Sequence, residues 1–287
     1  MQKTILVLGG TGLLGQPVAR RLQADGFKVK IMTRDAARAN KLFDSSFQVL
    51  AKDPANGADL EQALEGCYGV LISLPTEVEQ QVAELVAKSA ARCGVQRIGY
   101  VSGATVASEN RWFAQIDRKA RAEEAVRGAG VPYTIFCPTW FMESLPAFVT
   151  GGRASVFGKQ PHPFHWVAAE DYARMVSTAF GVEAAANKRL FVLGPEALSM
   201  RDALQTYITA FNPEVKSVST MPFWVANSIA LMSRNEKLKS VSQLMAYFEK
   251  TAERGDPAEA NKLLGAPQTT LAQWIAARKS SAVRIAA

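Results

Sequence analysis

The sequence has 287 residues, and its 33 lysines and arginines against 26 aspartates and glutamates give a formal net charge of +7. Hydrophobic residues make up 48% of the chain and charged residues 21%, which fits a soluble protein with a sizeable core. This balance excludes long disorder, a collagen repeat and a disulfide scaffold. Cys67, Cys93 and Cys137 lie far apart without a CxxC pair, so we expect a reducing compartment and no metal cluster.

The positive charge is scattered along the chain. The densest basic run, residues 118–121, has a helical pattern with Glu123 and Glu124 just behind it, which favours a solvated helix face over a nucleic-acid site. The best candidate for a membrane-spanning helix, residues 223–232, is far shorter than the roughly 18 residues needed. The N-terminus also lacks the order of regions of a signal peptide. We therefore expect a cytoplasmic protein with no nucleic-acid or membrane partner.

Short apolar runs alternate with helical patterns through the first half of the chain. The apolar runs predict strands over residues 4–8, 28–33, 47–51, 69–74, 97–101 and 133–137. Helical spacing with capping and stop signals predicts helices over residues 13–24, 35–42, 58–64, 77–93 and 117–127. Such alternation predicts an α/β fold, a Rossmann-like doubly wound parallel sheet with strand order 3-2-1-4-5-6 and a ligand crevice where the order reverses.

The alternation stops after about Phe141. Gly151-Gly152 and Pro161-His162-Pro163 indicate loops, and residues 190–193 form one more strand-like run. We therefore expect a nucleotide-binding domain in residues 1–150. Residues 151–287 are expected to form a smaller, irregular, mostly helical region that covers the crevice and contributes to a substrate site.

A glycine-rich turn follows the first predicted strand and opens the first predicted helix. It reads Gly9-Gly10-Thr11-Gly12-Leu13-Leu14-Gly15 and fits the GxGxxG pattern. In this pattern one glycine allows the sharp turn, one lets the backbone approach a pyrophosphate, and the last lets the helix pack on the strand. The helix N-terminus then offers N–H groups to the phosphates. We expect all of residues 9–15 to contact a dinucleotide.

The end of the second predicted strand indicates which dinucleotide is bound. An acidic residue there suits the ribose of NAD, whereas an arginine suits the 2′-phosphate of NADP. This chain has Arg34 at that point and Arg38 one helical turn later, which predicts NADP(H) over NAD(H). Alternatively, Arg34 is only a solvated residue at a helix start. Asp53, after the third strand, could accept from the adenine amino group or be an ordinary turn residue before Pro54.

These features together resemble the NmrA-like group of atypical short-chain dehydrogenases/reductases. The glycine turn and Thr33-Arg34-Asp35 begin the resemblance, and further matching segments are residues 131–135, 138–143, 169–173 and 193–196. The resemblance implies an NAD(P)-binding Rossmann domain with a small C-terminal substrate region. Members of the group include quinone and isoflavonoid-type reductases, as well as regulators that bind the cofactor without turning it over.

The resemblance also points to catalytic residues. Ser102 matches the serine of the superfamily, and Lys119 matches the lysine that holds the nicotinamide ribose. The usual tyrosine, four residues before that lysine, is replaced by Gln115, which cannot transfer a proton. Three alternatives remain open: Lys119 acts as the acid, a hydroxyl such as that of Tyr172 or Tyr100 substitutes, or there is no turnover.

The remaining candidate residues are expected to flank the nicotinamide or form an apolar pocket. Those flanking the nicotinamide are Ser73, Leu74 and Pro75 after the fourth strand, and Pro138 and Thr139 after the sixth. Candidates for the pocket, although core packing is the favoured interpretation of each, are Trp140, Phe141, Trp166, Phe223 and Trp224. His162 and His165 lack carboxylates at metal-binding spacing, so no metal is expected.

The sequence thus predicts an NADPH-dependent oxidoreductase acting on a small apolar carbonyl, quinone or enone. The alternative is a non-catalytic, NADP(H)-sensing regulatory or interaction protein that lacks the catalytic tyrosine. In either case the expected ligand is a small-molecule substrate or a nucleotide. A monomer and a homodimer both remain open.

Overall fold

A computed structural model of the chain describes residues 2–286, with side chains described as far as residue 280. Contacts between residues divide the chain into two compact units. The first comprises Met1–Pro138, Ala169–Val192 and Gly255–Pro267, and the second comprises Thr139–Ala168, Leu193–Arg254 and Gln268–Ala287. The sequence pattern predicts a single domain boundary near residue 150. In the structure the chain leaves the first unit after Pro138 and returns to it twice, at Ala169 and at Gly255.

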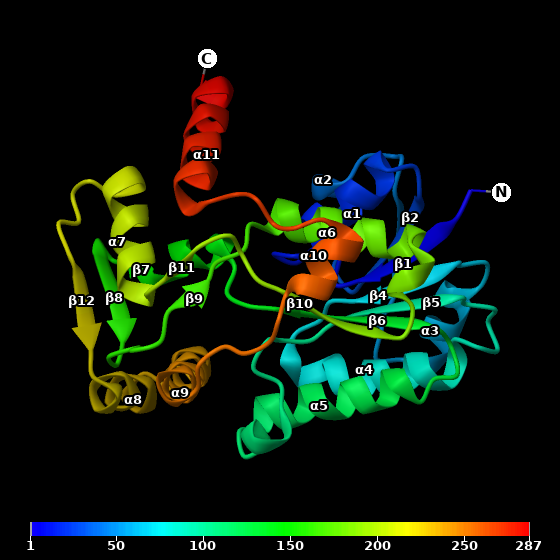
Figure 1. Ribbon diagram of the computed structural model, residues 1–287, viewed down its shortest axis with the longest axis horizontal. Helices are drawn as coiled ribbons and strands as arrows, with labels where there is room; N and C mark the ends of the chain where they lie inside the picture. The colour runs from blue at the N-terminus through cyan, green and yellow to red at the C-terminus, as the bar shows by residue number, and fades with distance from the viewer. Residues whose placement is uncertain (1, 287) are drawn as a thin grey trace. The chain divides into compact units, whose positions relative to one another are not determined.

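The first unit is built on a parallel sheet (Figure 1). Its strands are β1 (Thr4–Leu8), β2 (Lys28–Thr33), β3 (Gln48–Ala51), β4 (Gly69–Ile72), β5 (Arg97–Val101), β6 (Tyr133–Pro138) and β10 (Lys188–Val192). Within the described residues the order is β10-β6-β5-β4-β1-β2-β3. The predicted order 3-2-1-4-5-6 is therefore confirmed. The late strand-like run becomes β10, which extends the sheet beside β6.

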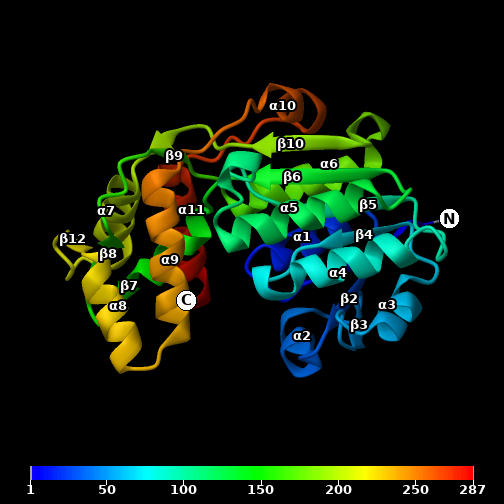
Figure 2. The same ribbon diagram turned by 90° about the horizontal axis from the view of Figure 1, so that it is seen from below.

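Helices cover both faces of this sheet (Figure 1). They are α1 (Gly15–Ala24), α2 (Ala36–Leu42), α3 (Gly57–Leu64), α4 (Thr76–Ser89), α5 (Ala114–Arg127), α6 (Ala169–Gly181) and α10 (Ala258–Leu264), with short 3-10 helices η1 (Ser108–Asn110) and η3 (Glu183–Ala185). Helix α1 packs against α6, and α4 packs against α5 on the other face (Figures 1 and 2). Asp35 caps α2 as predicted, because its Oδ1 accepts from the Arg38 backbone N–H at 2.9 Å.

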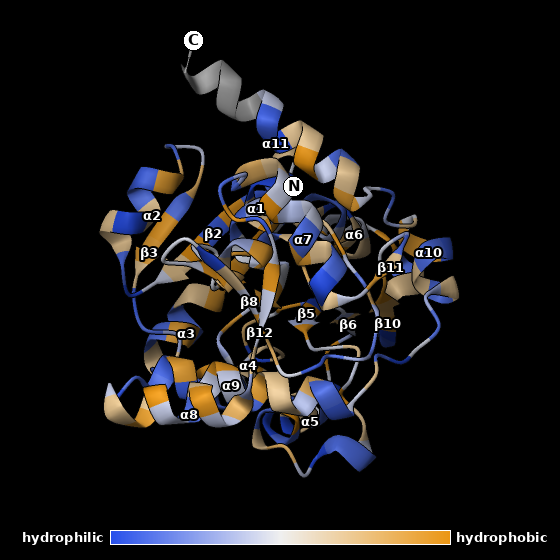
Figure 3. Ribbon diagram, turned by 90° about the vertical axis from the view of Figure 1, so that its left-hand side faces the viewer, coloured by the Kyte–Doolittle hydropathy of each residue, from blue (hydrophilic) through white to orange (hydrophobic). Residues whose placement is uncertain are grey.

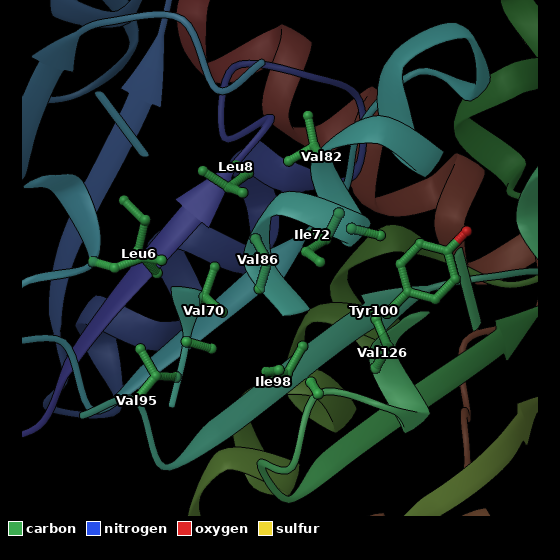
Figure 4. Packing of buried hydrophobic residues seen from close by; sticks show 14 of the residues in the cluster. Leu6, Leu8, Val70, Ile72, Val82, Val86, Val95, Ile98, Tyr100 and Val126 are labelled. Carbon is green, nitrogen blue, oxygen red and sulfur yellow. The ribbon is translucent and has the colours of Figure 1, made fainter. Parts of the chain in front are cut away.

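The core of the first unit follows from the alternation of side chains along the strands. Leu6, Leu8, Val70 and Ile72 project from β1 and β4 into a cluster with Val82 and Val86 of α4 and Val126 of α5, and all are fully buried (Figure 4). Burying such side chains contributes about 1.5–3 kcal/mol each, so this layer fixes α4 and α5 on the sheet.

The second unit has a separate small core. Its strands are β7 (Val149–Thr150), β8 (Arg153–Phe157), β9 (Phe164–His165), β11 (Ala197–Leu198) and β12 (Val218–Met221), and its helices are η2 (Met142–Phe148), α7 (Met200–Phe211), α8 (Phe223–Met232), α9 (Glu236–Lys250) and α11 (Leu271–Ala286). Trp166, Met200 and Met245 are fully buried in its core. Helix α8 is rich in hydrophobic residues (Figure 3), and its Trp224, Leu231 and Met232 are largely exposed. Among the described residues no helix combines the length and hydrophobicity needed to span a bilayer.

The turn after β1 depends on Gly9, which provides a test of the fold. Gly9 has φ +86°, and a Cβ placed there would lie 1.9 Å from the Ser73 carbonyl oxygen. Gly26 has a similar φ of +92° but open space around it. Gly26→Ala should therefore cost only the left-handed strain of about 1–2 kcal/mol. Gly9→Ala should cost a further ~1–3 kcal/mol for the steric overlap. Urea unfolding of both variants measures the difference, and equal losses would contradict the proposed overlap.

Candidate functional site

The glycine turn forms a tight cradle at the carboxyl end of the sheet. A Cβ at Gly15 would lie 2.1 Å from the Gly9 carbonyl oxygen, so the start of α1 can pack this closely only without a side chain. The Gly12 N–H donates to the Gly9 carbonyl at 2.9 Å and closes the turn. Gly12 itself is exposed and has no side chain, so a ligand can approach the turn closely at this point.

The cradle suits an anionic group. The N-cap residue of α1 is Leu14, whose side chain has no acceptor, and the first turn of α1 contains no acidic residue. The positive end of the helix dipole is therefore not compensated locally, which favours a phosphate there. Ser73 and Leu74 lie against Gly9, and Pro75 is the N-cap of α4. The structure thus brings the predicted residues after β4 next to the glycine turn.

The two predicted arginines lie beside this turn. Strand β2 pairs with β1 in parallel, so the end of β2 and the residues that follow it lie next to the loop after β1. The Arg38 Nη2 donates to the Thr11 carbonyl oxygen at 3.2 Å, which ties α2 to the glycine turn. Arg34 is exposed, and its side chain has no hydrogen bond or ion pair within the described part of the chain. Its guanidinium is therefore available for a phosphate.

Asp53 has a local structural role. Its Oδ1 accepts from the Ala55 backbone N–H at 3.0 Å, and its carbonyl accepts from the Asn56 N–H at 3.0 Å. These bonds are those of an ordinary turn residue. The adenine contact of Asp53 stays a prediction.

Ser102 belongs to a buried charged cluster. Its hydroxyl donates to Glu123 Oε1 at 2.5 Å, and Ser102 is only 5% exposed. The Glu123 carboxylate also binds Arg189 Nε at 3.0 Å and Arg127 Nη2 at 3.1 Å. The Ser102 hydroxyl therefore already donates its proton in a hydrogen bond, and toward a ligand it can act only as a hydrogen-bond acceptor.

Lys119 lies in a second, separate cluster. Its Nζ contacts Glu79 Oε2 of α4 at 2.8 Å and the Val101 carbonyl at the end of β5 at 3.4 Å. The Tyr100 hydroxyl donates to the same Glu79 oxygen at 3.2 Å. Burial raises the pKa of the Glu79 carboxyl, although the Lys119 ammonium opposes this shift. Lys119 keeps 21% of its side chain exposed and can reach a ligand.

The two tyrosines considered as substitute acids are poorly suited to that role. Tyr100 and Tyr172 are both fully buried. Burial raises the pKa of each phenol well above its ordinary value, and the Glu79 carboxylate raises that of Tyr100 further. Lys119 is therefore the best-placed proton donor among the candidates in this unit.

Sequence reasoning missed the buried carboxylates Glu79 and Glu123. A signal was present, because Glu79 shares the i, i+3, i+7 stripe of α4 with Val82 and Val86, which are core residues. An acidic residue on an apolar stripe indicates a buried partner of opposite charge. The sequence does not reveal that this partner is Lys119.

In the second unit, Thr139 joins a group around Glu253. The Thr139 hydroxyl donates to Glu253 Oε2 at 2.5 Å, the His165 backbone N–H donates to the same carboxylate at 3.1 Å, and His165 Nδ1 contacts it as well. No group of three or more potential metal ligands occurs among the residues that the structure describes. Trp166 is a fully buried core residue, which is the interpretation favoured for it, whereas Trp224 is 72% exposed.

A parallel sheet of this order, with a glycine-rich turn after its first strand, defines the Rossmann-type class of nucleotide-binding folds. Within this class the chain belongs to the NmrA-like family, whose sequence profile matches residues 1–275. The family resemblance inferred from the sequence is thus confirmed.

Individual relatives match over nearly the whole chain. The chain is 25% identical over 287 residues to the NAD(P)H azoreductase of Xenophilus azovorans, a match that covers 96% of this chain and 98% of that protein. Its structure is similar to that of Citrobacter sp. triphenylmethane reductase complexed with NADP(H), with a TM-score of 0.77, 19% identity and coverage of 95% and 98%. It is also similar to the Escherichia coli NADPH-dependent quinone oxidoreductase complexed with NADPH, with a TM-score of 0.76, 21% identity and coverage of 95% and 98%.

The raised pKa of Glu79 predicts a pH-dependent stability difference. A carboxyl with a higher pKa in the folded state stabilises the fold fully below its unfolded pKa of about 4.3 and loses this contribution as the pH rises through the folded pKa. Glu79→Gln should therefore gain stability relative to the parent as the pH increases from about 4. Urea unfolding across this range measures the trend, and a constant difference would contradict it.

Glu61 provides a control of opposite sign. A hydrogen bond from Ser89 and the charge of Arg92 lower the pKa of its carboxyl. Its stabilising contribution is present above the unfolded pKa and is lost as the pH falls through the folded pKa. Glu61→Gln should therefore lose stability relative to the parent as the pH rises over the acidic range.

Proposed function

We propose that the chain binds NADP(H) and reduces a small apolar carbonyl, quinone or enone. The observation that carries the proposal is the glycine cradle at the carboxyl end of the parallel sheet, with the side chain of Arg34 uncommitted beside it. The names of its relatives, an NAD(P)H azoreductase and an NADPH-dependent quinone oxidoreductase, support a nicotinamide cofactor and an electron-accepting substrate.

In this proposal the backbone of residues 9–15 holds the pyrophosphate, because the turn is open at Gly12 and positive at the start of α1. Arg34 and Arg38 bind the 2′-phosphate, for which a guanidinium offers paired N–H donors. A bound nicotinamide supplies the hydride. Ser73, Leu74, Pro75 and Pro138 are proposed to flank its ring.

Lys119 supplies the proton in this scheme. As an ammonium it gives a proton from Nζ to the substrate oxygen that becomes negative when the neighbouring carbon accepts a hydride, and the neutral amine then takes a proton from solvent. Its partly exposed side chain permits this exchange. Ser102 is proposed to accept a hydrogen bond from a donor group of the bound ligand, since its own hydroxyl proton is donated to Glu123.

The second candidate is an NADP(H)-binding regulatory protein without turnover. It is favoured by one observation: Gln115, in the first turn of α5, takes the place of the family's tyrosine. Both candidates require the cofactor, so they differ only in whether bound NADPH is oxidised.

The cofactor preference is tested with Arg34→Ser. Hydrogen bonds to a charged group contribute about 1.5–3 kcal/mol, so NADPH binding should weaken about 10- to 100-fold while NADH binding changes little. Titration of nicotinamide fluorescence measures both affinities. Arg92→Ser, an exposed ion-paired arginine on the C-terminal side of α4, is the control. Equal loss of NADPH and NADH affinity would contradict a 2′-phosphate contact.

Turnover is tested by NADPH oxidation over a panel of quinones, azo compounds and aldehydes. Lys119→Ala should lower kcat about 100- to 10,000-fold, the usual contribution of a general acid. Lys88→Ala, an exposed lysine near the end of α4, should leave it unchanged. Unchanged turnover in Lys119→Ala would remove this residue from the mechanism. Tight NADPH binding by a parent protein that oxidises none of the panel would favour the regulatory candidate.

A further inference from the structure

Glu79 is a buried carboxylate that its surroundings only half satisfy. It is 1% exposed and lies in the first turn of α4. Its Oε2 receives two contacts, from Lys119 Nζ at 2.8 Å and from the Tyr100 hydroxyl at 3.2 Å. Its Oε1 is fully buried and has no hydrogen-bond partner within the described part of the chain. A carboxylate in this state is expensive to bury.

Stability alone does not account for this residue. An apolar side chain of similar size would fill the same space between α4 and β5 without an unsatisfied oxygen, and such replacements are often neutral or stabilising. The surrounding layer is already apolar, with Ile72, Val82 and Val126 packed near Tyr100 (Figure 4). The property that only a carboxylate brings to this position is a charged acceptor for the Lys119 ammonium.

The contacts of Glu79 restrict where Lys119 can lie. A lysine side chain is a flexible four-carbon stem, so an unrestrained ammonium samples many positions. Here the stem comes from α5, while the groups that hold Nζ come from α4 and from the Val101 carbonyl at the end of β5. The Tyr100 ring adds a weak cation–π contact, with Nζ 5.9 Å from its centroid. Three elements thus fix one ammonium at the carboxyl end of the sheet, the edge at which such folds bind ligands.

We propose that Glu79 is the positioning residue of Lys119: its buried carboxylate, oriented by the Tyr100 hydroxyl, holds the ammonium at the carboxyl end of β5, where it meets the bound dinucleotide and the substrate oxygen. This inference rests on the proposed function and adds to it a residue that sequence comparison with short-chain dehydrogenases did not indicate. The raised pKa of Glu79 agrees with its burial. The charge of Arg118, the residue next to Lys119 on α5, opposes part of this rise in pKa. It therefore favours the ionised form of Glu79, which is the form that binds the Lys119 ammonium.

The test compares Glu79→Gln, Glu79→Asp and Tyr100→Phe with Glu84→Gln. Glu84 is a matched control because it lies on the same helix and contacts only Gln80 in the hydrogen bonds that the structure gives it. The first measurement is the rate at which acetic anhydride labels Lys119 in the protein without nucleotide, read by mass spectrometry at one fixed pH. It reports how firmly the amine is held and does not depend on turnover. Thermal melting confirms that each variant is folded.

Glu79→Gln should label Lys119 several-fold faster than the parent, because the amide no longer binds the ammonium as a charge. Glu79→Asp keeps the charge on a shorter stem, so its rate should fall between those of the parent and Glu79→Gln. Tyr100→Phe should show a smaller increase, and Glu84→Gln should match the parent. An unchanged labelling rate in Glu79→Gln would overturn the inference while leaving the proposed function intact.

The second measurement tests whether the contact between Glu79 and Lys119 contributes to cofactor binding and to turnover. NADPH should protect Lys119 from labelling in the parent. Glu79→Gln should weaken NADPH binding less than it lowers kcat. The fall in kcat should be about 10- to 100-fold, because misplacement of a reacting group by about 1 Å can cost about 100-fold. A folded Glu79→Gln protein with normal kcat would overturn the positioning role. A parent protein that neither binds nor oxidises NADPH would instead contradict the proposed function, whatever the labelling rates.

Discussion

The structure of the first unit depends on one constraint, the close packing of main-chain atoms around the glycine turn. Gly9 lies so near the Ser73 carbonyl, and Gly15 so near the Gly9 carbonyl, that no side chain fits at either glycine. The contact brings the end of β1, the start of α1 and the end of β4 together. It therefore creates the phosphate cradle and, in the same step, fixes the position of the segment that leads into α4.

This contact links the cradle to the catalytic candidate. Ser73, which Gly9 packs against, is followed by Leu74 and Pro75, and Pro75 is the N-cap of α4. The first turn of α4 carries Glu79, whose carboxylate holds Lys119. Only a few residues along the chain therefore separate the glycine turn's contact at Ser73 from the carboxylate that binds the ammonium. The proposed phosphate cradle and the proposed proton donor thus depend on the same packing.

Much of this fold could be predicted from the sequence, because the information is local. The residues of β1, β2 and β5 were predicted at the bounds observed, since each is an apolar run closed by a turn signal. The strand order follows from the rule for parallel crossovers. The helix expected over 77–93 ends at Ser89, because Ala90–Gly94 turns to bring Val95 back toward Ala90, and the helix expected over 117–127 begins at Ala114.

The pairing between distant segments could not be predicted from the sequence. The run at residues 190–193 shows its strand character, but its place beside β6 depends on a partner more than 50 residues away. For the same reason the two units could not be traced, since the chain crosses between them several times. The same holds for the site, where the glycine turn and Arg34 were found from local motifs. Glu79 acquires Lys119 only when α4 and α5 lie side by side (Figure 2), and Glu123 acquires Ser102 and Arg189 only when α5 packs beside the end of β5 and beside β10.

The two buried carboxylates also separate the roles of Ser102 and Lys119. Both residues were singled out together as members of one catalytic set, yet they bind different acids. Ser102 donates a hydrogen bond to Glu123, whose charge is balanced by two arginines, so this group is held by several contacts. Lys119 has one acid partner, Glu79, and retains exposed surface. A proton donor must be oriented and still exchange with solvent, and Lys119, in its proposed role, meets both conditions, whereas the Ser102 hydroxyl can act toward a ligand only as an acceptor.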